Sequence, residues 1–137
     1  MKVKAFWEFM CNSLGLKFFT GTPIYELKRL FDTMDPSLMH YIPTTNEETA
    51  LGLVSGVYLS GIKGAIFMSS ICFDKLKLFI EGFNTKYEIP VLLIVENDYN
   101  PLGLKQFDIT SLDQITNYLY EEEYKPCILV IREGDLT

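Results

Sequence analysis

Apolar and polar residues alternate along the chain in a pattern that predicts helices and strands in turn. Apolar residues recur every three or four positions over residues 3–14, which is the spacing of a helix with one buried stripe. Gly15 follows, at the position where a left-handed cap would end that helix. Residues 16–20 form a short apolar and aromatic run, which predicts a strand.

The same alternation continues to the end of the chain. Thr22 and Pro23 suit the cap and first position of a second helix, whose apolar stripe covers residues 27–34. In the segment 46–60 the apolar residues surround most of a helix, so we expect that helix to be buried. The remaining pattern predicts strands at 38–42, 64–69, 90–95 and 127–131, helices at 76–83 and 111–119 with a capping box from Ser111 to Gln114, and a loop at 96–108.

Apolar strands that alternate with helices are typical of βαβ units, which place a parallel sheet between layers of helices. With 137 residues, we predict one α/β domain over residues 1–137, a three-layer α/β/α sandwich with a mainly parallel sheet. Ligands of such folds bind beyond the carboxyl ends of the strands. The loops of interest are therefore 21–23, 43–47, 69–74 and 96–101.

Composition excludes several classes of function. A hydrophobic fraction of 48% argues against disorder, and a net charge of −6 without any basic run argues against nucleic-acid binding. The apolar stretches are much shorter than a membrane span, and the N-terminus lacks a secretory pattern, so we expect a cytoplasmic protein without membrane contact. The three cysteines are scattered and have no metal-ligand spacing; we interpret them as buried thiols and predict no metal site.

Few residues in the predicted loops suggest chemistry by themselves. No loop has a glycine pattern for binding phosphates, and His40, the only histidine, lies within a predicted strand, where a core or edge position is the simpler interpretation. Thr45 and Glu48 have the spacing of a capping box. Glu47 has no such local role. As a structural residue it is a carboxylate stabilised by the positive end of a helix dipole.

Four segments give the chain a resemblance to a known family. They are FFTGTPIYELKRLFD from residue 18, TNEETALGLVSGVYLSG from residue 45, YEIPVLLIV from residue 87 and KPCILVIREG from residue 125. In order and spacing they resemble the pyrimidine-binding domain of thiamine-diphosphate-dependent 2-oxo acid decarboxylases, most of all phosphonopyruvate and sulfopyruvate decarboxylases. The second segment is the most specific, because the family has a glutamate before a small-residue helix of this kind. Alignment without gaps puts that glutamate at Glu47.

The resemblance implies a catalytic role for Glu47, whose carboxyl would share a proton with the aminopyrimidine ring of thiamine diphosphate. It implies that Gly21, Thr22 and Pro23, together with Ser69 and Ser70, line the cofactor site. An apolar enclosure would raise the pKa of the Glu47 carboxyl. The substrate would be a small 2-oxo acid such as phosphonopyruvate or sulfopyruvate.

The resemblance also implies a partner. The family holds the diphosphate and Mg²⁺ on a second domain with a Gly-Asp-Gly signature, which these 137 residues lack. We therefore expect a second subunit that carries the diphosphate-binding domain and the Mg²⁺ and shares the cofactor, and contacts between copies of this chain through the helix after Asn46.

Three alternatives remain open at this point. The bulky Ile71 and Phe73, and the acidic Glu96 and Asp98, depart from the family's loops and would suit a binding or regulatory module that has lost catalysis. An enzyme acting on another 2-oxo acid, such as an acetolactate-type carboligase, and an unrelated flavodoxin-like domain are the others.

Overall fold

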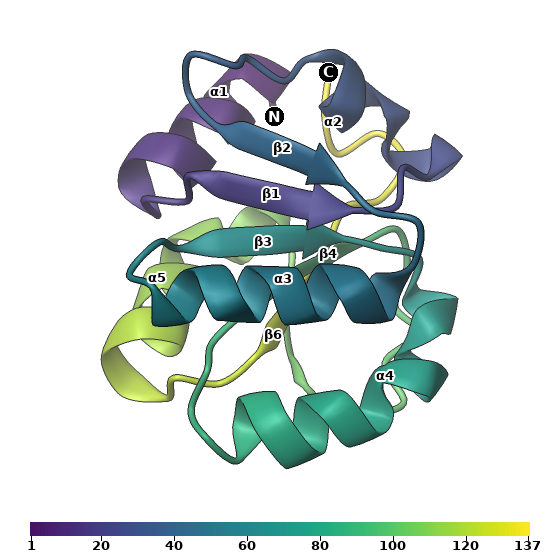
Figure 1. Ribbon diagram of the computed structural model, residues 1–137. Helices are drawn as coiled ribbons and strands as arrows, with labels where there is room; N and C mark the ends of the chain where they lie inside the picture. The colour runs from purple at the N-terminus through teal and green to yellow at the C-terminus, as the bar shows by residue number, and fades with distance from the viewer.

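Six parallel strands form the centre of the molecule (Figure 1). The computed structural model describes residues 1–137 and orders the strands β2-β1-β3-β4-β6-β5. This confirms the predicted α/β class and shows that the sheet is parallel throughout. The strands are β1 (Phe18–Gly21), β2 (His40–Pro43), β3 (Gly64–Phe67), β4 (Leu92–Val95), β5 (Lys105–Phe107) and β6 (Cys127–Val130).

Strand β5 is the one strand that the apolar pattern does not predict. It lies inside the segment 96–108, which the sequence predicts as a loop. The strand is only three residues long, forms the edge of the sheet beside β6, and buries Phe107 alone. A strand with one buried side chain leaves no periodic signal in the sequence.

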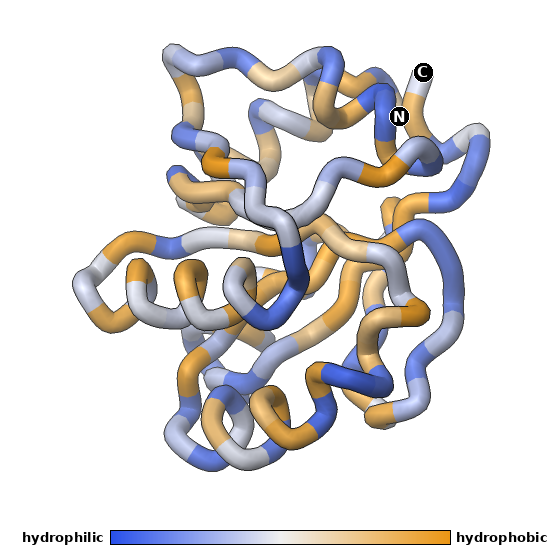
Figure 2. Tube along the Cα trace, turned by 45° about the vertical axis from the view of Figure 1, so that its right-hand side comes forward, coloured by the Kyte–Doolittle hydropathy of each residue, from blue (hydrophilic) through white to orange (hydrophobic).

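Helices cover both faces of the sheet, which confirms the three layers. On one face lie α1 (Val3–Glu8), α2 (Lys28–Asp32) and α5 (Ile115–Asn117), and on the other α3 (Glu47–Leu59) and α4 (Phe73–Phe79). All residues of β1, β3, β4 and β6 are buried, and Figure 2 shows the hydrophobic colour concentrated in these inner strands. No helix has the length and apolar character that crossing a bilayer requires.

Several helix ends differ from the predicted ones. The first helix continues past α1 as a π-helical turn over Phe9–Ser13, and Gly15 has the expected left-handed conformation with φ of +74°. Thr22 and Pro23 do not begin a helix, because the chain stays extended through Ile24 and turns into a short 3-10 helix only at Tyr25–Leu27, before α2.

The cap of α3 also differs from the prediction. Asn46 is the N-cap, and its side-chain oxygen accepts a hydrogen bond of 2.7 Å from the Thr49 amide. The predicted capping box between Thr45 and Glu48 is therefore wrong, because the helix begins one residue later than that box requires.

A similar shift of register applies at the start of the 3-10 helix Ile109–Gln114, which leads into α5. Asp108 is the N-cap there, and Ser111 completes its capping box as the third residue instead of acting as the cap itself. The predicted box from Ser111 to Gln114 is wrong for this reason.

Helix α3 is buried on one side only, in contrast to the prediction. Its inner face packs on the sheet through Ala50, Leu51, Val54 and Ser55. Its outer face carries Leu59, which is 64% exposed. The prediction was wrong because α3 lies in an outer layer, so one side of the helix faces away from the sheet.

The cap geometry gives the first testable prediction. Replacing Asn46 with Ala removes the acceptor for the Thr49 amide and should lower the free energy of unfolding by about 1 kcal/mol in urea denaturation. Glu48→Gln is the matched control, since Glu48 is exposed, and should change the value by less than about 0.5 kcal/mol. Equal losses in both variants would contradict the assignment of Asn46 as the cap.

Candidate functional site

The loops in which the sequence places the site meet at one edge of the sheet. All six strands point the same way, so the segments after β1, β2, β3 and β4 emerge at their common carboxyl edge. The Thr44 amide donates to the Gly21 carbonyl at 3.0 Å, which joins the loops after β2 and β1. Ser70 after β3 and Glu96 after β4 are also hydrogen bonded to each other. The structure thus brings the predicted site residues to one edge.

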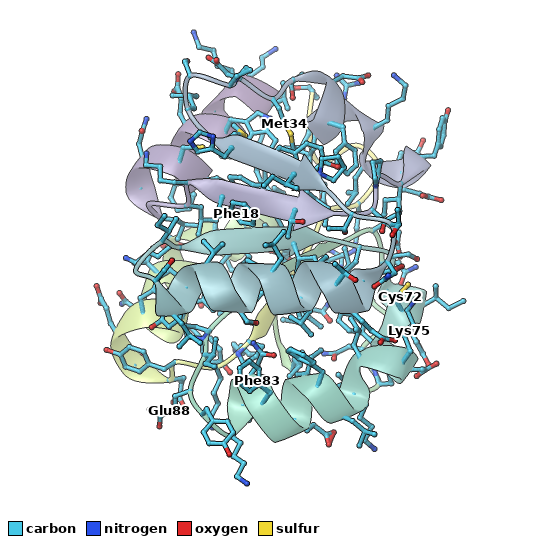
Figure 3. All side chains as sticks on the ribbon, in the orientation of Figure 1. Phe18, Met34, Cys72, Lys75, Phe83 and Glu88 are labelled. Atoms are coloured by element: carbon cyan, nitrogen blue, oxygen red, sulfur yellow. The ribbon has the colours of Figure 1, made fainter.

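Glu47 lies at this edge as the first residue of α3. Its side chain is 13% exposed, so it is neither directed into bulk water nor fully enclosed. The Cys72 thiol donates to Oε1 at 3.0 Å, and the Lys75 ammonium lies 3.4 Å from Oε2. Figure 3 shows Cys72 and Lys75 beside the N-terminal end of α3. Both carboxylate oxygens therefore have a partner from the segment after β3.

The two bulky residues of the same segment do not cover this carboxylate. Ile71 is 71% exposed at the surface, and Phe73 is buried in the core between α3, α4 and the sheet. The side chains of Ile71 and Phe73 therefore leave the Glu47 carboxylate uncovered.

The environment lowers the pKa of Glu47, whereas the sequence led us to expect a raised pKa. Partial burial is the largest influence and acts to raise it. The hydrogen bond from Cys72, a backbone hydrogen bond and the charge of Lys75 together outweigh burial. The expectation was wrong because it considered burial alone. The Glu47 carboxyl is thus ionised at neutral pH.

The contact between Cys72 and Glu47, which lowers the pKa of the carboxyl, raises the pKa of the thiol. Burial, and then the hydrogen bond to Glu47 and its negative charge, raise the pKa of Cys72 to about 11. Cys72 is consequently a protonated donor at neutral pH. All three cysteines are free thiols; Cys11 and Cys127 are buried as predicted, whereas Cys72 is only partly buried because it lies in the segment after β3 at the edge of the sheet.

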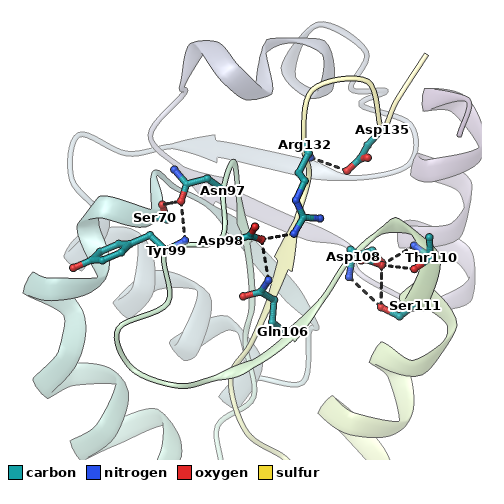
Figure 4. A network of polar contacts seen from close by, with 10 residues as sticks. All are labelled: Ser70, Asn97, Asp98, Tyr99, Gln106, Asp108, Thr110, Ser111, Arg132 and Asp135. Carbon is teal, nitrogen blue, oxygen red and sulfur yellow. Dashed lines mark hydrogen bonds and ion pairs between the residues drawn. The ribbon is translucent and has the colours of Figure 1, made fainter.

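Ser69 and Ser70, both candidate cofactor-binding residues, each donate to Glu96 Oε1, the Ser69 hydroxyl at 3.5 Å, but they differ in burial. The buried Ser70 donates to Glu96 Oε1 from its amide at 3.0 Å and from its hydroxyl at 2.8 Å, and its hydroxyl is also 2.6 Å from Asn97 Oδ1. Figure 4 shows Ser70 within a polar network that continues through Asn97 to Tyr99. Ser70 therefore fixes the loop after β4, while Ser69 is the more accessible of the two.

Glu96 has a feature that the sequence does not reveal. Its Oε1 accepts the bonds from Ser70, but its Oε2 is buried without a hydrogen-bond partner. Asp98, the second acidic residue of this loop, forms an ion pair with Arg132 and accepts a hydrogen bond from Gln106. Of these two acidic residues, Glu96 is the one with a buried oxygen that has no hydrogen-bond partner.

Gly21, Thr22 and Pro23 form the other side of the edge. Gly21 has φ of +129°, and a Cβ atom there would lie 2.0 Å from the Phe67 carbonyl oxygen, so the glycine is required by packing between strands. Thr22 donates to the Thr44 carbonyl at 3.3 Å, and Pro23 is exposed.

A cavity of about 810 Å³ lies beside α2 at the same edge. It is lined from the segments after β1, β4 and β6, and Glu47 does not line it. The lining residues of the cavity are Tyr25, Glu26, Lys28, Arg29, Asp32, Thr33, Glu96, Ile131 and Glu133.

His40 is exposed at the start of the edge strand β2. The chain has no group of three or more histidine, cysteine or acidic side chains placed to hold a metal ion.

Solved structures share this arrangement of strands and helices. A thiamin diphosphate-dependent enzyme from Mycobacterium smegmatis superimposes with a TM-score of 0.78 over 98% of this chain and 31% of its own, at 12% identity. The 2-oxoglutarate:ferredoxin oxidoreductase of Magnetococcus marinus gives 0.76 over 98% of this chain and 29% of its own, at 15% identity. The fold is that of a domain of thiamine-diphosphate-dependent enzymes.

Sequence comparison adds a more specific relationship. The chain is 31% identical over 84 residues to the alpha subunit of sulfopyruvate decarboxylase from Methanococcus maripaludis, and 32% identical over 85 residues to that from Methanocaldococcus jannaschii. Each match covers 61% of this chain, which spans about half the length of these relatives. No family model matches the chain. The resemblance drawn from the sequence is confirmed in both sequence and fold.

The Glu47 contact predicts low reactivity of Cys72. At pH 8, iodoacetamide should modify Cys72 roughly 100-fold more slowly than a free cysteine, because little thiolate is present. Glu47→Gln removes the neighbouring negative charge and should accelerate the modification, whereas Glu48→Gln should not. Mass spectrometry of the alkylated peptide measures both rates. Modification of wild-type Cys72 at the free-cysteine rate would contradict this environment.

Proposed function

We propose that this chain is the pyrimidine-binding subunit of a heteromeric thiamine-diphosphate-dependent decarboxylase that acts on a small 2-oxo acid. The observation that carries the proposal is the position of Glu47, a partly exposed carboxylate in the first turn of α3 at the carboxyl edge of a parallel sheet. Sequence similarity to sulfopyruvate decarboxylase alpha subunits supports a substrate of the sulfopyruvate or phosphonopyruvate type.

The residues at this edge fit the aminopyrimidine end of the cofactor. Glu47 is reachable from solvent and is a suitable hydrogen-bond partner for a ring nitrogen. Acidic side chains are unsuited to the diphosphate, which requires cations or backbone amides. We therefore assign the diphosphate and Mg²⁺ to the partner subunit.

Thiamine diphosphate, when bound, supplies the carbon nucleophile for the 2-oxo group and accepts the electron pair left by departing carbon dioxide. The role of this chain is to bind the aminopyrimidine ring and to polarise it. Glu47 would share a proton with the ring nitrogen, and Gly21, Thr22 and Pro23 would line the site on one side. Ser69 and Ser70 would line it on the other, with Ser70 acting through the loop that it fixes.

The charge at the site bears on the substrate. Asp98 is neutralised by Arg132, so it contributes less repulsion toward an anionic substrate than its sequence position suggests. Glu96 is the other acidic residue of this loop, and no cation pairs with it. It selects for a substrate whose anionic groups are directed away from β4, toward the partner subunit.

The outer face of α3 is the proposed surface for contacts between copies of this chain. Leu59 is exposed there, and the backbone at Gly52 and Gly56 has no neighbouring atom within reach of a Cβ. An apolar face with open glycines permits close approach of a second helix.

A second function has one specific observation in its favour. Glu47 already has partners for both oxygens in Cys72 and Lys75, as a purely structural helix-start carboxylate would. A binding or regulatory module that kept the fold and lost catalysis would retain this arrangement.

Replacement of Glu47 with Gln distinguishes the two functions. In the complex reconstituted with the diphosphate-binding chain, thiamine diphosphate and Mg²⁺, we expect Glu47→Gln to reduce decarboxylation at least 100-fold, because the proton shared with the ring is lost. Glu48→Gln should retain activity. Full activity of Glu47→Gln would refute the catalytic role, and an inactive wild-type complex that still assembles would support the regulatory module.

Sedimentation equilibrium tests the α3 surface. We expect the isolated chain to self-associate at high concentration, and Leu59→Lys to weaken that association about tenfold by placing a charge in the contact. Leu78→Lys is the matched control, because Leu78 is 85% exposed on α4. A wild-type chain that remains monomeric, or equal effects of both variants, would contradict the assignment.

A further inference from the structure

The carboxylate of Glu47 is held from one direction by two side chains of the segment that follows β3. Cys72 closes a 3-10 turn over Ser70–Cys72, and Lys75 lies in the first turn of α4, three residues later. Side chains three residues apart on a helical segment lie on the same face. The thiol contacts Oε1 and the ammonium approaches Oε2, so each oxygen has its own partner.

We propose that Cys72 and Lys75 are positioning residues that direct the Glu47 carboxylate toward α4, because each of them contacts one of its two oxygens. This inference rests on the proposed function of Glu47. A carboxyl that gives a proton to a ring nitrogen must first carry that proton, so the two residues control the fraction of the chain that is ready to act.

Lys75 is the positively charged group that lies beside Glu47. Among the other acidic groups nearby, Glu48 on α3 is exposed, Asp74 on α4 accepts a hydrogen bond from Tyr99, and Glu96 after β4 is bonded to Ser70. The strands β1 and β3, on which α3 packs, contribute no titratable side chain. Lys75 is the only cation that pairs with Glu47.

The contact can also be released. The Lys75 side chain is 47% exposed, so its ammonium can exchange the carboxylate for water at little cost. The Cys72 thiol is a weak donor that a stronger hydrogen-bond partner of Glu47 can replace. Protonation of Glu47 removes the attraction to Lys75, so uptake of the proton and release from α4 are coupled.

Carbon-13 NMR of the chain labelled in its glutamate carboxyl groups tests the contact without cofactor or partner. The Glu47 signal is assigned by its absence in Glu47→Gln. We expect its midpoint to lie below the usual glutamate value and to rise by about 0.5 to 1 pH unit in Lys75→Met, because the neighbouring cation is gone. Cys72→Ala should raise it in the same direction, and Lys75→Arg should restore the wild-type midpoint.

Lys77→Met is the matched control. Lys77 is exposed on the same helix and has no contact with Glu47, so the midpoint should not move. An unchanged midpoint in Lys75→Met, or an equal shift in Lys77→Met, would overturn the inference while leaving the proposed function of Glu47 intact.

The pH profile of decarboxylation by the reconstituted complex tests the consequence. If Glu47 acts in its protonated form, the high-pH limb of kcat/KM should move upward in Lys75→Met by the shift that NMR measures, with no such movement in Lys77→Met. A shifted NMR midpoint with an unmoved profile would overturn the positioning role. A separate result, full activity of Glu47→Gln, would refute the proposed function itself.

Discussion

Parallel pairing of every strand is the constraint on which the candidate site depends. Because β1, β2, β3 and β4 all point to one edge, the segments that follow them are brought together although they are separated by some 20 residues in sequence. Glu47 lies at this edge because α3 must begin there to return along the sheet. Its partners Cys72 and Lys75 lie beside it for the same reason, since α4 begins after the adjacent strand β3.

The sequence predicts those parts of the fold that depend on burial. Strands β1, β3, β4 and β6 are apolar at almost every position because helices cover both of their faces, and they were all predicted. β5 was missed because it buries one residue at an edge. The cap of α3 was misassigned by one residue, since Thr45, Asn46 and the acidic residues after them suit several capping patterns and only the backbone path selects one.

The candidate site could be predicted in part. The position of Glu47 at a strand-to-helix junction follows from the pattern of elements, but the sign of its pKa shift does not. That sign depends on Cys72 and Lys75, which are 25 and 28 residues distant in sequence and contact Glu47 only through the packing of α4 beside α3. The spacing from Cys72 to Lys75 carries no recognisable motif, so no signal in a single sequence would have identified them.

In this account, Glu47 is one half of a shared site, with the cofactor's diphosphate held by another chain. Exchange of the C2 proton of thiamine diphosphate in D₂O measures this claim most directly, because it reports activation of the ring without any assumption about the substrate. NMR of the cofactor with the diphosphate-binding chain, with and without this chain, should show exchange accelerated only when both chains are present. Acceleration that is equal with wild-type Glu47 and with Gln at that position would contradict the account.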